Sequence, residues 1–398
     1  MRVLFSFVGG TGHAEPLVPV ADAVRAAGHD VAFTGHKRYL PPLTSRGFRT
    51  FAVDGGSGGP PPAGRLPLIE PSQQNEDRVI REYYLGEVPR RRAPGYAEFY
   101  ARWRPDLVIR DEMDIGAAVL AEADGLPHVV VQVFAAGSFL RPAVVAEPLA
   151  ALRGEHGLPP DPDLRSLGGD LVLSPFPVGF RDPAYPLPAT ARLFRAAEPA
   201  GPDPAGPDPG PMPSWWTGLP DRPVVYVTLG TIFALESGDL FERLLAGLAA
   251  LPVEVIATVG RDLDPAALGR QPVNVHVERW LPSAQVLSRA DLVVSHGGSG
   301  TVAAALTHGL PQLVVAMGAD QLQNAGRITD LAIGRALHPV TCTPAQVRDA
   351  AAALLDDQRA RLAARRLQAE MAAMPAVDTV IPELERLAVR RADGRAAP

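Results

Sequence analysis

A histidine and a run of small residues follow an apolar stretch in the last third of the chain. The letters HGGSGT occupy residues 296 to 301, after LVVS and before VAAALTHG. Glycines leave backbone N–H groups uncovered, and such groups at a helix N-terminus attract an anion. The ring of His296 and the hydroxyls of Ser299 and Thr301 add hydrogen-bond donors. The pattern predicts a phosphate-binding turn, although an ordinary strand-to-helix turn with Ser/Thr capping has the same composition.

A second histidine ends the turn GGTGH that follows the first apolar run. The neutral imidazole of His13, with an ordinary pKa of about 6.5, can remove a proton from a hydroxyl group. Asp111 ends the run PDLVIRD, where a carboxylate can fix the ring and stabilise its protonated form. We therefore predict His13 as a general base and Asp111 as its partner. Asp114 is the weaker candidate for that partner, Glu112 is expected to be solvated, and helix capping is the simpler role for His13 and Asp111.

Apolar runs of strand length alternate with helical patterns in both halves of the chain. The runs cover 2–8, 30–35, 106–111 and 127–134 in the first half, and 223–230, 253–260, 274–280, 292–298 and 311–317 in the second. Such alternation predicts parallel, doubly wound sheets that bind ligands at the carboxyl ends of their strands. The fold class is therefore expected to be α/β, with two doubly wound Rossmann-like domains facing across a cleft.

Composition narrows the class of partner. The 398 residues carry a net charge of −6 with no basic block, which argues against nucleic acid. The single cysteine, Cys342, cannot form an internal disulfide, and no Cys/His spacing is typical of a zinc site. No apolar run approaches the roughly 20 residues that cross a bilayer. We expect a cytoplasmic protein without a membrane span, a metal or a cofactor, and with a small-molecule partner.

The segment from 280 to 321, WLPSAQVLSRADLVVSHGGSGTVAAALTHGLPQLVVAMGADQ, resembles the donor-binding box of family 1 glycosyltransferases of the GT-B fold, in particular their bacterial natural-product branch. The motifs GTGHAEPLVPVADAVRAAGHDV, PDLVIRD and VVYVTLGT precede it in the family's order, so that the resemblance extends over nearly the whole chain. Neither glycine-rich turn matches a dinucleotide motif, because Glu15 occupies the third glycine position of the first turn, and neither carries a P-loop.

The resemblance implies a role for each residue of the donor site. Trp280 would stack on the nucleotide base, and the backbone of Leu281 would contact it. The HGG turn would hold the diphosphate, and Asp320 with Gln321 would bind hydroxyls of the sugar; a core Trp and a helix-capping Asp are the simpler alternatives. The expected set is Gly230, Thr231, Trp280, Leu281, His296, Gly297, Gly298, Ser299, Gly300, Thr301, Asp320 and Gln321.

One position departs from the family pattern. Members that use UDP-sugars often carry a glutamate eight residues after the box histidine, where it holds the ribose hydroxyls, and here that position is Ala304. The deoxyribose of a dTDP-linked sugar has no 2′-hydroxyl to bind. The resemblance therefore favours a dTDP-sugar donor.

Domain boundaries follow from a Pro/Gly-rich stretch and from the strand and helix alternation that restarts after it. We expect an acceptor-binding N-terminal domain over 1–195 and a Pro/Gly-rich linker over 196–222. A nucleotide-sugar-binding domain over 223–375 would follow, and a C-terminal helix over 376–398 would pack back on the first domain. The polar segment 54–77 and the irregular, Pro-rich segment 134–188 are expected to shape the acceptor pocket.

The function implied is transfer of a deoxysugar from dTDP to a hydroxyl of a hydrophobic natural-product aglycone such as a polyketide. The mechanism would be a single displacement with inversion, with His13 as the base and no metal. N- or C-glycosylation by the same fold, and a non-catalytic auxiliary of another transferase, are the alternatives. The sequence leaves a homodimer open.

Overall fold

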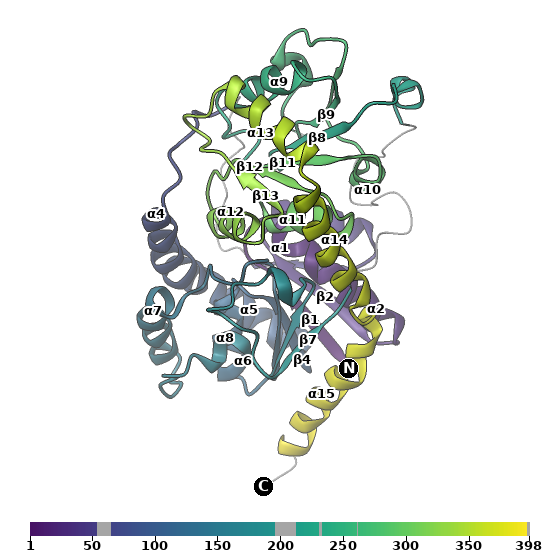
Figure 1. The fold of residues 1–398 in the computed structure, drawn as a ribbon. Helices are drawn as coiled ribbons and strands as arrows, with labels where there is room; N and C mark the ends of the chain where they lie inside the picture. Colours follow the sequence, from purple (N-terminus) through teal and green to yellow (C-terminus); the bar gives the residue numbers. More distant parts are fainter. Residues whose placement is uncertain (54–64, 196–211, 231–232, 261, 396–398) are drawn as a thin grey trace. The chain divides into compact units, whose positions relative to one another are not determined.

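The computed structural model describes residues 1–53, 65–195, 212–230, 233–260 and 262–395, with side chains up to residue 389. These residues form two units (Figure 1). The first unit takes its described residues from Met1–Gly58, Gln74–Ala200 and Met374–Pro398. The second takes them from Gly59–Gln73 and Gly201–Ala373. Residues 196–211 of the expected linker lie outside the described residues.

The first unit is built on a parallel sheet of seven strands in the order β3-β2-β1-β4-β5-β6-β7. Alternate side chains of a strand point to opposite faces of a sheet. In β1, Val3 and Phe5 accordingly lie in one buried cluster and Leu4 in another. The strands are β1 (Arg2–Ser6), β2 (Asp30–Gly35), β3 (Arg49–Ala52), β4 (Leu107–Asp111), β5 (His128–Val131), β6 (Leu171–Ser174) and β7 (Ala191–Leu193).

Helices cover both faces of this sheet. They are α1 (Thr11–Ala14), α2 (Val18–Ala26), α3 (Pro41–Ser45), α4 (Gln73–Arg78), the π-helix η3 (Val79–Glu87), α5 (Val88–Trp103), α6 (Ile115–Ala123), α7 (Pro142–Glu155), α8 (Arg165–Gly168) and α15 (Ile381–Arg395). Short 3-10 turns are η1 (Glu15–Leu17), η2 (Lys37–Tyr39), η4 (Val178–Phe180) and η7 (Val377–Val380). The C-terminal segment belongs to this unit, because Val380, Ile381 and Leu384 are buried in the cluster that contains Val20 and Val24 of α2.

The second unit is a parallel sheet of six strands in the order β10-β9-β8-β11-β12-β13. The strands are β8 (Val224–Thr228), β9 (Glu254–Thr258), β10 (Val275–Glu278), β11 (Leu292–Ser295), β12 (Gln312–Val314) and β13 (Gly334–Ala336). The helices are α9 (Leu240–Ala249), α10 (Ser283–Leu287), α11 (Ser299–Thr307), α12 (Gln321–Asp330), α13 (Pro344–Asp356) and α14 (Gln358–Ala373), with 3-10 turns η5 (Ser214–Gly218) and η6 (Pro265–Leu268).

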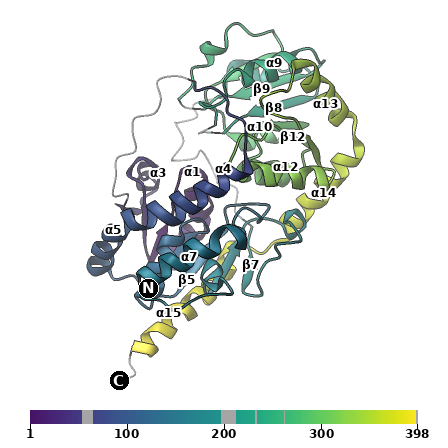
Figure 2. The same ribbon diagram turned by 90° about the vertical axis from the view of Figure 1, so that its left-hand side faces the viewer.

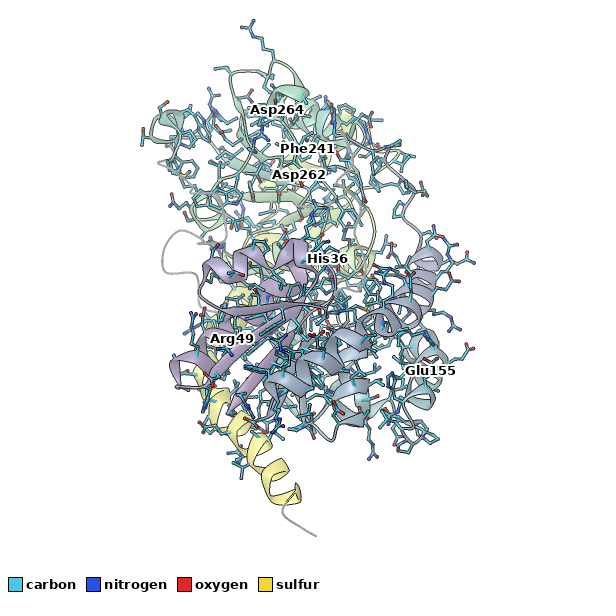
Figure 3. All side chains as sticks on the ribbon, turned by 180° about the vertical axis from the view of Figure 1, so that it is seen from behind. His36, Arg49, Glu155, Phe241, Asp262 and Asp264 are labelled. Atoms are coloured by element: carbon cyan, nitrogen blue, oxygen red, sulfur yellow. The ribbon has the colours of Figure 1, made fainter. Side chains whose placement is uncertain are left out.

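Helices α9 and α13 lie side by side on one face of this sheet (Figure 2). Phe241 of α9 is fully buried inside the unit, whereas Asp264 lies at its surface (Figure 3). The prediction of two parallel, doubly wound sheets is confirmed. All nine strands that the apolar runs predicted are present.

Two segments expected to be irregular are partly regular. The stretch 134–188 contains the 14-residue helix α7 and strand β6. Its prolines do not prevent this, because Pro142 is the first residue of α7, where the missing N–H costs nothing. Within the polar segment 54–77, residues 54–64 lie outside the described residues, and α4 begins at Gln73.

Candidate functional site

Both candidate sites lie where the strand order of a sheet reverses. In the first unit this point is between β1 and β4; His13 follows β1 and Asp111 ends β4. In the second unit it is between β8 and β11; Gly230 follows β8 and His296 follows β11. In doubly wound sheets, ligands bind in the crevice outside the strand ends at this point. The topology therefore brings the predicted residues to the two expected positions.

The His13 ring sits beside a buried carboxylate and a buried aromatic ring. Its Nδ1 is 3.4 Å from Oδ1 of Asp111, and its side chain is 19% exposed. The ring of Phe134 meets it edge-on, with centroids 5.7 Å apart and planes at 87°. A separation of 3.4 Å is longer than an ordinary N–H···O hydrogen bond, and catalytic hydrogen bonds often tighten only when substrate is bound.

Backbone amides fix the carboxylate of Asp111, which is fully buried. Oδ2 accepts a hydrogen bond from the N–H of Val8 at 2.7 Å. Oδ1 accepts from the N–H groups of Met113 at 2.6 Å and Asp114 at 3.0 Å. Asp111 is thus held in place beside His13 by the strand ends themselves.

Asp114, the alternative partner of His13, serves another part of the unit. Its Oδ1 accepts from the Ala117 N–H at 3.2 Å and so caps helix α6. Its Oδ2 accepts from Ser6 at 2.6 Å, from Tyr96 at 2.9 Å and from Arg92 at 3.0 Å. Burial opposes ionisation, but Arg92 and these donors hold the pKa of Asp114 below its ordinary value. The carboxylate of Asp114 therefore bonds to groups in the buried core, and the carboxylate beside His13 is that of Asp111.

The expectation that Glu112 is solvated is wrong. Its Oε1 accepts hydrogen bonds from the N–H groups of Val133 at 2.9 Å and Phe134 at 2.6 Å. Burial raises the pKa of Glu112 to about 7. Glu112 therefore ties the end of β4 to the segment after β5, from which Phe134 reaches the His13 ring. No local sequence pattern distinguishes this contact from a surface glutamate.

In the second unit the ring of His296 is enclosed by two glycines. An added Cβ would lie 2.8 Å from the ring at Gly230, whose φ is +72°, and 2.5 Å from it at Gly298. These glycines therefore make room for the imidazole, a reason that the sequence pattern did not give. Burial lowers the pKa of His296 to about 4, although a hydrogen bond to the backbone of Thr228 opposes the shift, so that the ring is neutral near pH 7.

Helix α11 begins directly after this ring. Gly298 is its N-cap and contributes no side-chain hydrogen bond to the first turn. Gly300 is exposed, with open space where a Cβ would lie. The turn thus has the uncovered backbone of an anion site. The hydroxyl of Ser299 was predicted as a donor to a phosphate. In the structure it is buried and donates to Oδ2 of Asp320 at 2.5 Å.

A buried amide that the sequence analysis missed joins α11 to α12. Nδ2 of Asn324 donates to Gly297 O at 2.9 Å, to Ser299 Oγ at 3.1 Å and to Asp320 Oδ2 at 2.8 Å. Asp320 stands at the N-cap position of α12, yet its side chain makes no capping bond. Its spacing of four residues from Asn324 on a helix was the signal that could have linked the two.

The Asp320–Gln321 pair is more enclosed than expected for two sugar ligands. Asp320 is 7% exposed and Gln321 1%. Oε1 of Gln321 accepts from the N–H groups of Met317 at 2.7 Å and Gly318 at 3.2 Å. The pair therefore shapes the loop after β12, in addition to any contact with a ligand.

Trp280 and Leu281, predicted to contact the nucleotide base, follow the carboxyl end of a strand in the same sheet. Trp280 follows β10 and is half-buried, and Leu281 is buried in an apolar cluster. Because β10 is three strands from β11, Trp280 stands about 14 Å from His296 along the edge. Thr231 lies outside the described residues. Among the described residues, no three His, Cys, Asp or Glu side chains come together as metal ligands.

Comparison with known proteins identifies the family. The family model "Erythromycin biosynthesis protein CIII-like, C-terminal domain" matches residues 242–387. Tylactone mycaminosyltransferase of Streptomyces fradiae is 30% identical, over 99% of this chain and 94% of its own. The chain belongs to the antibiotic glycosyltransferase family.

Two crystal structures extend this match to the fold of the glycosyltransferase. That of the glycosyltransferase SnogD from Streptomyces nogalater is 28% identical with a TM-score of 0.76, over 98% of this chain and 99% of its own. The crystal structure of VinC in complex with dTDP is 25% identical with a TM-score of 0.75, over 98% of this chain and 100% of VinC. The GT-B fold and the nucleotide-sugar glycosyltransferase activity that the sequence predicted are confirmed. No described helix of this glycosyltransferase is long and apolar enough to cross a membrane.

Proposed function

We propose that this glycosyltransferase moves a sugar, in particular a deoxysugar, from a dTDP-linked donor to a hydroxyl group of a small natural-product aglycone such as a polyketide, in the cytoplasm. The observation that carries the proposal is the position of His13 beside the buried Asp111 at the strand-order reversal of the first unit. The match to an erythromycin biosynthesis family supports a natural-product acceptor. The dTDP complex of VinC supports the nucleotide.

His13 acts as the general base in this proposal. With Nδ1 facing Asp111, the proton on that nitrogen is held by the carboxylate, and Nε2 is left to accept the proton of the acceptor hydroxyl. The acceptor oxygen then attacks the anomeric carbon as the bond from that carbon to the phosphate oxygen breaks. dTDP leaves with the bonding electron pair, and the configuration at the anomeric carbon inverts. The carboxyl group of Asp111 stabilises the imidazolium that forms.

The second unit supplies donors for the charge that develops on the leaving diphosphate. The first-turn N–H groups of α11 carry the positive end of the helix dipole. His296 is neutral and adds a hydrogen bond rather than a charge, because burial holds its pKa near 4. Gly230 and Thr231 are proposed as further phosphate contacts, and Trp280 with Leu281 as contacts to the base. Such preorganised donors can stabilise a leaving group without a metal.

The identity of the nucleotide follows from Ala304. This residue is half-buried on α11 and offers no acceptor to a ribose 2′-hydroxyl. A buried hydroxyl without a partner costs about 1 to 3 kcal/mol, and dTDP avoids this cost because its sugar lacks that hydroxyl. The proposal therefore includes a preference for dTDP over UDP.

A product assay tests the proposal. The purified chain is incubated with matched dTDP- and UDP-sugars and a panel of polyketide-like aglycones, and each product is analysed by mass spectrometry and NMR. We expect an O-glycoside of inverted anomeric configuration, formed with the dTDP-sugars. A retained configuration would contradict the single displacement, and a sugar attached to nitrogen or carbon would replace the O-linked assignment.

A further inference from the structure

Residues 65–73, here named the clasp, come from the first half of the chain but belong to the second unit. Arg65 donates through Nη1 to Oε2 of Glu242 in α9 at 2.7 Å, and through Nη2 to the other oxygen of that carboxylate. Burial opposes the ionisation of Glu242, but the hydrogen bond from Arg65 holds its pKa below the ordinary value. This two-point geometry makes the pair stronger and more specific than a simple surface ion pair.

Further contacts fasten the rest of the clasp. Glu70 is 2.7 Å from Nε2 of His338, in the segment between β13 and α13. At the other end of the clasp, Nε2 of Gln323 in α12 donates to Gln73 at 2.5 Å. Leu68 packs against the buried core of the second unit. The clasp is thus held along its whole length by this unit.

The backbone of the clasp pairs with the loop between β8 and α9. The N–H of Leu66 donates to Leu235 O at 2.6 Å, and the N–H of Gly238 donates to Leu66 O at 3.1 Å. Within the loop, the N–H of Glu236 donates to Phe233 O at 3.1 Å, which closes a turn. The clasp therefore fixes the position of the turn from 233 to 238.

This turn carries an aromatic ring to the candidate diphosphate site. The ring of Phe233 lies against His296, with centroids 5.8 Å apart and planes at 37°. Gly230, which encloses the same imidazole, precedes the turn by three residues. A continuous path of contacts thus runs from Arg65 through the loop to His296.

We propose that the clasp is a positioning element for nucleotide binding: by holding the turn from 233 to 238, it sets Phe233 against the ring of His296. The nucleotide site of the second unit then depends on a segment that lies, in the sequence, between two stretches of the first unit. This inference rests on the proposed assignment of His296 to the diphosphate. The clasp residues act through the loop and are not themselves ligands.

Calorimetric titration of dTDP into the full chain tests the inference. Arg65→Ala should raise the dTDP dissociation constant about five-fold or more, the lower range of measured site-to-site couplings. Glu242→Gln should weaken binding similarly, since it keeps the side-chain shape and removes the charge. The double exchange of Arg65→Glu with Glu242→Arg should restore affinity to within about two-fold, since the pair is re-formed in the opposite sense.

Two further variants separate a positioning role from a merely stabilising one. Arg222→Ala is the matched control: it removes an ion pair with Glu254, 3.7 Å away, at the amino ends of β8 and β9, and should leave dTDP binding unchanged. In a Phe233→Ala background, Arg65→Ala should have little further effect on affinity, because the path to His296 is already broken.

The outcomes are distinguishable. Unchanged dTDP affinity in Arg65→Ala and Glu242→Gln, with only a lower unfolding temperature, would overturn the positioning role. Failure of the exchange variant to recover affinity would also overturn it. If the parent chain itself binds no dTDP, the proposed function fails instead.

Discussion

Asn324 provides a sensitive test of the network that joins α11 to α12. Its fully buried amide donates to Gly297, Ser299 and Asp320, and the distance to the Asp320 carboxylate is 2.8 Å. Asn324→Ala leaves a buried carboxylate and a buried carbonyl short of a donor, which should cost about 3 kcal/mol of stability. Because the missing group does not titrate, this loss should be nearly independent of pH between 5 and 8.

Asn324→Asp should behave differently, because it places a second carboxyl group beside Asp320. The two cannot both ionise at this separation, so that one pKa of the pair is raised in the folded state. The substituted protein is then fully stabilised below the unfolded Asp pKa of about 3.9, and it loses stability as pH rises toward the raised pKa. Keeping one carboxyl group of the folded protein protonated at pH 7 costs about 4 kcal/mol, because pH 7 is about three units above the unfolded Asp pKa.

Thermal unfolding of the parent and both variants, at pH values from 4.5 to 8, measures the difference. The unfolding temperature of Asn324→Asp should approach that of the parent near pH 4.5, where the protonated acid can donate as the amide did, and fall well below it at pH 7 and above. Titration with dTDP should show the same pH trend. A deficit of Asn324→Asp that is as flat with pH as that of Asn324→Ala would refute the network.

Three further predictions concern the two sites. His296→Ala should weaken dTDP binding by about 1.5 to 3 kcal/mol, the range for a hydrogen bond to a charged group. An unchanged calorimetric dissociation constant would show that the HGGSG turn has only a structural role. Ala304→Glu should narrow a dTDP-over-UDP preference of about ten-fold in competitive titrations, and a parent chain that prefers UDP would contradict the argument. Glu112→Ala should slow sugar transfer, because the N–H of Phe134 loses its acceptor. Glu112→Gln should slow transfer less, because its amide oxygen can still accept that hydrogen bond. Because burial raises the pKa of Glu112 from 4.5 to about 7, the folded state loses stability as pH rises from about 4.5 to about 7, and the loss is constant above that. The unfolding temperature of Glu112→Gln relative to the parent should therefore rise between about pH 5 and 7 and level off above, and a difference that stays constant over that range would show that burial does not raise the pKa of Glu112.

Most strands that are buried on both faces were predictable, but β6, which is also fully buried, was missed because it lies in a segment interpreted as irregular. Runs such as RVLFSFV and LVVS predict strands because nearly all of their residues are apolar, and β1 and β11 are found at those positions. The edge strands β3, β7 and β13 were missed, since one side of an edge strand is unpaired and its composition is mixed. Helix α7 was missed because proline was interpreted as a breaker, although Pro142 begins the helix and Pro148 lies within it.

The candidate site was predictable at the strand ends and not beyond them. His13, Asp111 and His296 each follow or end an apolar run, and parallel topology places such residues at one edge. The contacts of Glu112 with Phe134 and of Asn324 with Gly297 join elements that are distant in sequence, so that no local pattern reveals them. Local pattern also does not show what a glycine accommodates, which is why the room that Gly298 makes for an imidazole appeared only in three dimensions.

The clasp illustrates the same limit. The segment 54–77 was predicted to shape the acceptor pocket because it is polar and rich in glycine and proline. Its described part from Arg65 to Gln73 belongs to the second unit, where Glu242 and the turn from 233 to 238 hold it, and its role in an acceptor pocket stays a prediction. Long-range contacts such as these leave no signature in the segment's own composition.

The turnover of His13→Ala, measured with a dTDP-sugar and an accepted aglycone alongside dTDP affinity, tests whether His13 is the general base. We expect a fall in kcat of roughly 10² to 10⁴, typical of losing a general base, with the dissociation constant of dTDP nearly unchanged. Asp111→Asn should lower kcat in the same way but by less. Undiminished O-glycosylation by His13→Ala would contradict the account.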